Sequence, residues 1–552
     1  MDSSRQALRR QLPPHRWVCS YATGIAIFLA LALLLQLFKE ELSIMLTRGR
    51  QMLLAFASVG LSQNSVDGDG SVDLSWHPPK QTQINNLTAV LTGEGVYGFI
   101  YNSSNTPDER YGVYNWCNMP HVRRQEYVKA PPEYELVYVE LIHRHHKRTP
   151  YASNAFPVEP YPWDCDDQAL YYYGEPFDDH TQKATPAYWK GYTSPTNPFT
   201  PSGWRGTCQF PQITAQGLAD SWQHGADLYA VYHDLLGFLP ARHGAHWRRR
   251  VAFRVTHNTI TSQVASMAVH GLFRAGAGAG VHVPLLVQPP AVDSLEPRYP
   301  CPAAQRLFAD LTAPDRNATW KAHLDGAQAL FARLDAVSGV PPDDAGFHAS
   351  FDHYYDNLSA RECHQLPLPC TSTGSGGSGS DGDGDGGGGG GGGEKCVMRD
   401  MADEVYRIGN WEYSHIYRSE EASLEASVAS FGVWIAELAA HLRNAMGEGE
   451  GNDGVIYWHN IAHDGSVSRL LSVLQIEEMV WPGMGSEVVF ELFKEKRGGR
   501  YFVRVLFGGK VLRSSSPALG VMDMVPVERV LGYFEGLVGK GANKVKGKCE
   551  GK

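Results

Sequence analysis

The sequence predicts an α/β fold in which a mainly parallel central sheet is flanked by helices, with an inserted helical cap and an antiparallel C-terminal strand pair. Three observations predict it. Residues 134–142 (YELVYVELI) form a nearly continuous apolar run, typical of a strand buried on both faces. Helix-like and strand-like segments then alternate along the chain. Two β-branched runs near the C-terminus predict neighbouring antiparallel strands.

The predicted elements follow the chain in order. After the first strand, a helix is expected over 214–236, and a strand over 251–256 leads into a second helix over 260–273. Apolar residues from Leu424 to Leu442 recur at steps of four and three, which is the stripe of a long helix packed against a core. The remaining expected elements are a strand from 455–458 that runs on to His463-Asp464, a helix over 466–474, and antiparallel strands over 488–492 and 501–506.

This order of elements predicts how the chain is divided. Residues 133–295 and 447–552 are expected to form the α/β domain, and the helix-rich segment 296–446 between them is the expected cap. Within the cap, residues 371–394 are rich in Ser, Asp and above all Gly, so they cannot bury enough surface to offset their ordering entropy and should form a flexible loop. Residues 39–132 should form a juxtamembrane segment and an irregular extension packed on the domain.

The N-terminal region predicts insertion into a membrane. Residues 17–38 carry no charge and are long enough, as a helix, to cross a bilayer core of roughly 30 Å. The arginines before this segment favour a cytosolic tail over 1–16 and a signal anchor, with the rest of the chain lumenal or extracellular. The alternative is a start at Met45 followed by a cleaved signal peptide, which would make the protein secreted.

Cysteines and glycosylation sequons agree with export. Eight cysteines lie outside the apolar segment, an even set suited to four disulfides whose pairing the sequence leaves open. They are Cys117, Cys165, Cys208, Cys301, Cys363, Cys370, Cys396 and Cys549. The absence of a C-x-x-C pair argues against a cysteine zinc site. N-x-S/T sequons predict glycans at Asn86, Asn102, Asn317 and Asn357.

Charge and composition restrict the partners. The net charge is -10 and no long Lys/Arg block is present. The chain therefore offers no electrostatic attraction for non-specific binding of nucleic acid. A hydrophobic content of 43% is ample for a globular core. The oligomeric state stays open.

The residues that could carry chemistry follow the first predicted strand directly. Residues 143–148 (HRHHKR) place three imidazoles and three cations where the carboxyl edge of an α/β sheet usually binds its ligand. Arginine matches phosphate oxygens, and a neighbouring imidazole can attack phosphorus. The alternatives are a solvated basic loop and a metal site through His143 and His145, for which the sequence offers no identifiable third ligand.

Four motifs carry a resemblance to a known family. Residues 144–150 (RHHKRTP) resemble the RHGxRxP signature of the histidine acid phosphatases, with His146 in place of the glycine. Residues 214–217 resemble the family's T-x-x-G helix start, 254–256 its R-x-T strand end, and His463-Asp464 its HD motif. The order and spacing extend to the C-terminal strand pair, and the whole sequence resembles a subgroup found in filamentous fungi.

The resemblance implies roles for particular residues. Arg144, Arg148 and His463 would hold the phosphoryl oxygens, His145 would attack, and Asp464 would protonate the leaving alcohol. A second His-Asp pair, His233-Asp234, lies within an amphipathic helical run and is interpreted as an exposed helix face. No metal or organic cofactor is implied, and an acidic pH optimum is expected because the acid must be protonated.

Two departures from the family pattern weaken the comparison. The family has a further phosphate-binding Arg six residues after the R-x-T arginine, and here that position holds Ile260. Arg254, His257 or His146 could replace it, although Arg254 could as well form a buried structural pair. His146 also adds a ring where the family's backbone comes close to its ligand.

The function that follows is an acid phosphomonoesterase acting through a phosphohistidine, with an unknown phosphomonoester as substrate. The alternative is a weakly active or inactive phosphatase-fold glycoprotein that binds a phosphorylated ligand. Persistence of His145 and Asp464 favours the enzyme, whereas Ile260 and His146 favour the binding protein.

Overall fold

The computed structural model describes residues 72–96, 116–158, 161–168, 170–171, 188–192, 194, 196–200, 203–241, 249–273, 283–371, 395–448 and 454–552. Four sequence predictions lie outside these residues: the tail over 1–16, the anchor over 17–38, the glycan at Asn102 and nearly all of the Gly-rich loop over 371–394.

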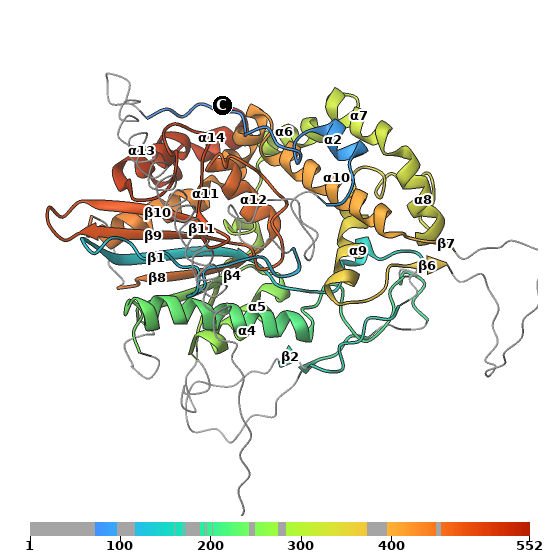
Figure 1. The fold of residues 1–552 in the computed structure, drawn as a ribbon, viewed down its shortest axis with the longest axis horizontal. Helices are drawn as coiled ribbons and strands as arrows, with labels where there is room; N and C mark the ends of the chain where they lie inside the picture. The colour runs from blue at the N-terminus through green and yellow to red at the C-terminus, as the bar shows by residue number, and fades with distance from the viewer. Residues whose placement is uncertain are drawn as a thin grey trace, which may run out of the picture. The chain divides into compact units, whose positions relative to one another are not determined.

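A central sheet joins both halves of the predicted α/β domain. Its strand order is β11-β10-β9-β1-β8-β4-β5, with β12 beside β10 (Figure 1). The parallel strands are β1 (Tyr134–Arg144), β8 (Tyr457–Ala462), β4 (Val251–Val255) and β5 (Leu285–Val287). The antiparallel strands are β9 (Glu487–Glu495), β10 (Tyr501–Phe507), β11 (Lys510–Val511) and β12 (Val525–Pro526). The predicted fold class is therefore confirmed.

Helices cover both faces of this sheet (Figure 1). One face carries α4 (Ala215–Tyr229), which continues into a π-helical segment (Ala230–Leu235), and α5 (Thr259–Phe273). The other face carries α11 (Glu421–Met446), α12 (Asp464–Val473) and α13 (Val527–Val538). Because apolar side chains of β1 pack on both layers, the strand has the continuous hydrophobic pattern of a doubly covered strand.

A set of helices lies beside the sheet, between β5 and α11 in the chain (Figure 1). They are α6 (Pro302–Thr312), α7 (Ala318–Gly326), α8 (Gln328–Ser338), α9 (Asp352–Cys363) and α10 (Arg399–Tyr417). α11, the last helix of the predicted cap segment, packs against α6 and also against α12, α13 and β1. The smaller elements are α2 (Leu87–Thr92), α14 (Val545–Glu550), β2 (Leu170–Tyr171), β3 (Tyr188–Trp189), β6 (Cys370–Thr371) and β7 (Lys395–Cys396).

Four disulfides are formed, as the even cysteine count predicted. They are Cys117–Cys363, Cys165–Cys208, Cys301–Cys549 and Cys370–Cys396. Disulfides form and persist in oxidising compartments, so the set indicates folding in the secretory pathway or outside the cell. Cys117 lies in the N-terminal extension and Cys363 ends α9, so this bond fastens the extension to the main fold.

Among the described residues, α11 is the one helix whose length and apolar composition would suffice to cross a membrane. Some 72% of its most apolar window is buried inside the protein, and its stripe of Leu424, Phe431, Ile435 and Leu442 belongs to the main core. The helix is accounted for by core packing.

Candidate active site

Three neighbouring parallel strands end at one edge of the sheet. Arg144 at the end of β1 lies opposite Ala462 at the end of β8, and Val255 at the end of β4 lies opposite Ile461. The residues that follow these strands are therefore brought together although they are far apart in sequence. The Oγ1 atom of Thr256 lies 3.0 Å from Nε2 of His463, and the ring centroids of His145 and His463 are 5.5 Å apart.

A cavity of about 350 Å³ opens at this edge. Five of the predicted site residues line it: Arg144, His145, Arg148, His463 and Asp464. The other lining residues are Tyr151, Asn154, Glu296, Pro297, Arg298, Asp352, Asp356, Tyr413, Gly465, Ser466, Arg469 and Trp481. His233-Asp234 does not line it, so the His463-Asp464 pair is the one at the cavity.

His145 is held in one orientation and one tautomer. Its Nδ1 lies 3.0 Å from the carbonyl oxygen of His146, which can only accept, so Nδ1 carries the proton and Nε2 keeps its lone pair. Burial, and then the charges of Arg148 and Arg144, hold the pKa of His145 well below its usual value. The residue is therefore a neutral imidazole with an unprotonated nitrogen, which is the form a nucleophile requires.

The two motif arginines are both paired with carboxylates. Arg144 Nη2 lies 3.0 Å from Asp464 Oδ2, and Arg144 Nη1 donates to the carbonyl of Pro482 at 2.7 Å. Its guanidinium also lies over the ring of Trp116 at 4.7 Å. Arg148 contacts both carboxylate oxygens of Asp356, at 3.0 and 3.2 Å, while its Nε points at Nε2 of His145, 3.4 Å away.

Asp464 is the first residue of α12, where a carboxylate is favoured by the helix dipole. Its Oδ1 accepts from the backbone of Gly465 at 2.8 Å, and its Oδ2 accepts from Nε1 of Trp481 at 2.9 Å. Burial alone would raise the pKa of Asp464, but the charge of Arg144 and the bond from Trp481 outweigh it and lower that pKa. The carboxyl is thus ionised when the cavity holds no anion.

A second carboxyl in the cavity, that of Asp352, has a raised pKa, whereas the pKa of Asp464 is lowered. Burial, followed by the charges of Asp356 and Asp464, raises the pKa of Asp352 to about 7. Asp352 opens α9, more than 200 residues from the first motif, and nothing in the local sequence marks it as a site residue. It is a protonated carboxyl at acidic pH.

His463 contacts both Thr256 and an acidic residue. Its Nε2 lies 3.3 Å from Oε2 of Glu296. Burial alone would raise the pKa of Glu296, but the hydrogen bond and charge of His463 lower it to about 2. Glu296 therefore places a negative charge beside the imidazole of His463.

Arg254 does not reach the cavity. Its guanidinium is buried and contacts Glu437 at 2.7 Å and Asp293 at 3.2 Å. It also donates to Gln288 and Ser294. The expected phosphate-binding role is corrected: Arg254 is the buried structural pair that the sequence also allowed, because its Nη1 and Nη2 donors are already used by carboxylate and polar acceptors.

Ile260 and His146 both point away from the cavity. Ile260, in the first turn of α5, is 1% exposed and packs with Ile213 and Val264. The ring of His146 is buried, and its Nε2 lies 3.1 Å from Nδ1 of His224 on α4. The expected intrusion of His146 into the ligand site is therefore wrong, because Gly485 leaves room for the ring on the other side of the loop.

The T-x-x-G segment supports the nucleophile loop. Thr214 caps α4 by accepting from the backbone of Gly217 at 3.2 Å. A Cβ added at Gly217 would lie 2.0 Å from the carbonyl oxygen of Lys147, so only glycine lets the helix approach the loop this closely.

Several cavity residues were not anticipated from the sequence. Arg469 on α12 adds a cation to the cavity; it donates to the carbonyl of Gly465 at 2.8 Å and to Oγ of Ser430 at 3.1 Å. Trp116 belongs to the predicted irregular extension, and its ring lies under the guanidinium of Arg144. The HDGSVSR spacing could have suggested Arg469, since positions 465 and 469 are one helical turn apart.

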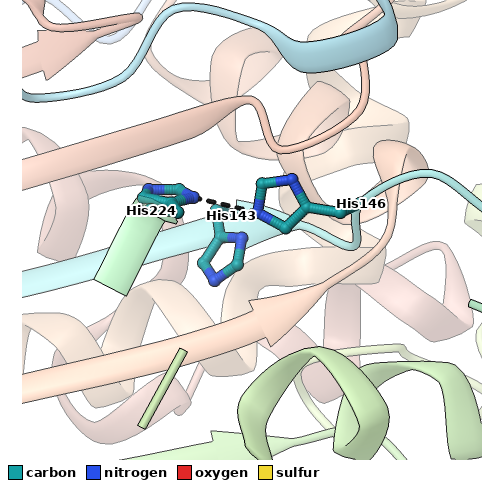
Figure 2. A group of neighbouring side chains, drawn as sticks. All are labelled: His143, His146 and His224. Atoms are coloured by element: carbon teal, nitrogen blue, oxygen red, sulfur yellow. Dashed lines mark hydrogen bonds between the residues drawn. The ribbon is translucent and has the colours of Figure 1, made fainter. Parts of the chain in front are cut away.

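Histidines also gather behind the strand edge. Nitrogens of His143, His146 and His224 lie within 4.8 Å of one another, outside the residues that line the cavity (Figure 2). The pair considered from the sequence, His143 with His145, is not the pair that the fold brings together, because His145 lines the cavity and His143 does not.

The three described sequons differ in their surroundings. Asn86 is exposed and Asn317 is half-buried, and each caps a helix through its side chain. Asn357 is fully buried, and its Nδ2 donates to the carbonyl of Asn154 at 2.9 Å. A glycan on that nitrogen has no room in the folded chain, so Asn357 is withdrawn as a glycosylation site.

No family model and no curated protein matches the chain. Solved structures with a similar arrangement include the apo phytase of Hafnia alvei, at 12% identity and a TM-score of 0.45, covering 75% of this chain and 99% of that one. The phytase of Citrobacter braakii matches at 12% and 0.45, covering 73% and 98%. A Bifidobacterium longum multiple inositol polyphosphate phosphatase complexed with inositol hexasulfate matches at 11% and 0.39, covering 72% and 92%. At this level of similarity, the chemistry of the cavity has to be inferred from its own residues.

Proposed function

We propose that the chain is an acid phosphomonoesterase of the histidine acid phosphatase type, with His145 as the phosphate-accepting nucleophile. The observation that carries the proposal is the state of His145. Its Nδ1 donates to the His146 carbonyl oxygen, and its unprotonated Nε2, which accepts from Nε of Arg148, shares a cavity with two arginines and Asp464. An uncharged imidazole between cations suits in-line attack on an anionic phosphoryl group.

Each step can be assigned to a cavity residue. Arg144, Arg148 and His463 hold the phosphoryl oxygens, and Arg469 supplies a further cation where Ile260 cannot. Nε2 of His145 forms the N–P bond as the ester P–O bond breaks, and Asp464 gives its proton to the leaving oxygen. Water then attacks phosphorus with Asp464 as base, the N–P bond breaks, and phosphate leaves with His145 neutral again.

Binding of the substrate prepares Asp464 for this role. In the free cavity Arg144 keeps Asp464 ionised. A phosphate dianion that binds Arg144 weakens this pairing and places negative charge beside the carboxylate, and both effects raise the pKa of Asp464. Because the acid form is still needed, turnover should be fastest at acidic pH.

A second candidate function is a phosphate-binding protein without turnover. It is favoured by the carboxylate partners of both motif arginines and by the core position of Ile260, since a phosphate must compete with Asp464 and Asp356 for the guanidinium groups. The cavity would then recognise a phosphorylated ligand without completing the reaction.

One experiment distinguishes the enzyme from the binding protein. Phosphate release from a panel of monoesters by the purified full chain is measured from acidic to neutral pH. The panel should include aryl phosphates, sugar phosphates and an inositol polyphosphate. Release that peaks at acidic pH and is lost in His145→Ala supports the enzyme. Binding of phosphate or vanadate without release from any ester supports the binding protein.

We also propose that residues 17–38 anchor the chain, with the cavity on the lumenal or extracellular side. The four disulfides support export. Protease protection on intact membranes should shield the region after residue 41, and deglycosylation should change its size. Recovery of the chain from the medium without its N-terminal residues would favour the cleaved signal peptide, and a protease-accessible cytosolic domain would contradict both.

A further inference from the structure

Three buried histidines from three segments converge behind the nucleophile. His143 lies near the end of β1, His146 in the loop that follows, and His224 on α4 (Figure 2). Each is no more than 1% exposed, and none of them lines the cavity. The phosphatase mechanism proposed above uses none of these side chains.

Their nitrogens lie at nearly the spacing of a metal site. One nitrogen from each lies within 4.8 Å of the others, and Nε2 of His146 is 3.1 Å from Nδ1 of His224. Tetrahedral Zn–N bonds of about 2.0–2.1 Å would separate the nitrogens by about 3.3 Å. The His146–His224 pair is already at this spacing, whereas the set as a whole reaches it only if the rings turn.

The outer nitrogens have the partners that orient metal-bound imidazoles. Nδ1 of His143 lies 2.8 Å from the carbonyl oxygen of Arg144, and its Nε2 lies 2.8 Å from Nε2 of His459. Nε2 of His224 lies 2.9 Å from Oε2 of Glu487, which leaves Nδ1 as the ligand atom. A backbone carbonyl and a carboxylate are the usual acceptors behind such ligands. The buried Nδ1 of His146 has no hydrogen-bond partner among the residues that the structure describes.

A buried carboxylate beside the cluster also favours binding of a cation. Glu487 is fully buried and is bonded to the backbone nitrogen of Val122 and to His224. Its one ion-pair partner among the described residues is His224, so no Lys or Arg offsets its charge there. A buried carboxylate beside neutral imidazoles is costly, and a bound divalent ion would compensate it.

We propose that His143, His146 and His224 bind one divalent transition-metal ion, with Glu487 positioning His224. Three imidazoles match Zn²⁺ best among the ions that proteins commonly hold. His459 lies beside the set, with its Nε2 2.8 Å from Nε2 of His143, but it is not among the three residues whose nitrogens all lie within 4.8 Å of one another. Since two ligands flank Arg144 and His145, the ion would fix the loop that carries the nucleophile and serve a structural role.

Metal binding by the full chain tests this directly. The purified protein is stripped with a chelator and equilibrated with Zn²⁺ or Co²⁺, and bound metal per chain and the melting temperature are measured. We expect one ion per chain, a higher melting temperature with Zn²⁺, and a visible spectrum of tetrahedral Co²⁺. His224→Gln and His146→Asn should lose the ion, and Glu487→Gln should weaken affinity about 10–100-fold.

Two controls make the result specific. His323→Gln removes another fully buried, carboxylate-paired histidine, which contacts Glu412 at 2.8 Å, and should keep the ion. His145→Ala removes the cavity imidazole and should keep it too, which excludes adventitious binding at the active site. Should the ligand variants fail to fold, X-ray absorption on the Zn²⁺-loaded wild type decides, with at least three imidazole nitrogens expected at about 2.0–2.1 Å. A wild type that takes up no ion, an ion without imidazole ligands, or ligand variants that retain it would overturn the proposal.

Discussion

The ring of His146 and the backbone of Gly485 share one space. Gly485 has a φ of +72°, and a Cβ added there would lie 2.4 Å from Cε1 of His146. The histidine that replaces the family's motif glycine is therefore accommodated by a glycine more than 300 residues further along the chain.

Gly485→Ala should destabilise the fold by about 1–3 kcal/mol, because the new methyl meets the ring and the backbone conformation is strained. Urea unfolding measures it. Adding His146→Gly should recover the steric part of the loss and leave the backbone strain. If Gly485→Ala lowers the unfolding free energy equally with His146 and with glycine at position 146, the contact between the new methyl and the His146 ring does not contribute to the destabilisation.

His145→Ala should abolish turnover, whereas Asp464→Asn should slow it most for esters with poor leaving groups. An alkoxide needs the proton that Asp464 gives, and a phenolate hardly does. Steady-state rates on alkyl and aryl phosphates measure the contrast. An acid-labile phosphoenzyme should be trapped in the wild type and be absent from His145→Ala; wild-type rates in His145→Ala would make the nucleophile assignment wrong.

Asp352→Asn should make stability less dependent on pH. In the unfolded chain Asp352 ionises near pH 3.8, whereas in the fold its pKa is about 7, so between these values the folded state binds more protons and stability falls as pH rises. The variant lacks this loss, so its melting temperature relative to wild type should increase across that window and level off above it. A pH-independent difference would contradict the raised pKa.

At the scale of elements, the first turn of α5 explains why an arginine placed at position 260 would not reach the cavity. The R-x-T strand end leads into α5, whose position 260 faces the core formed with Ile213 and Val264. The orientation of α5 therefore directs position 260 into the core.

Ile260→Arg should therefore destabilise the protein by more than about 3 kcal/mol, since it buries an unpaired charge. Thermal unfolding measures this, and phosphate affinity should not improve in any folded fraction. Ile260→Val is the matched control and should cost only about 0.5–1.5 kcal/mol. Tighter phosphate binding by the arginine variant would show that α5 can turn position 260 to the cavity.

At the scale of the whole molecule, two kinds of disulfide hold the fold. Cys117–Cys363 joins residues 246 apart and fastens the extension that carries Trp116 beneath Arg144. Cys370–Cys396 joins residues only 26 apart, around the Gly-rich segment. The first connects separate parts of the fold, whereas the second closes a local loop.

Replacing both cysteines of the first bond by serine should cost more stability than doing so for the second. Loop-closure entropy predicts a difference of about 2 kcal/mol for these separations. Loss of the first bond should also raise KM, because Trp116 supports a phosphate-binding arginine. Unfolding and KM of the two double variants test this; equal stabilities would contradict the entropic argument.

The sequence by itself determined the central strands, their order along the chain and five residues of the cavity. These follow from local patterns, because β1 is buried on both faces and reads as a continuous apolar run, and the motifs sit directly after strand ends. The even cysteine count likewise determined that four disulfides form, although not how they pair.

Only the tertiary structure decided which way the remaining side chains point. Arg254 turned to Glu437 and Asp293, His146 turned to His224, and Asp352 entered the cavity from a helix far along the chain. Each outcome depends on partners that are tens to hundreds of residues away or on free space left by a distant glycine. Local sequence carries no record of such contacts, because a side chain's direction is set by the packing of the elements around it.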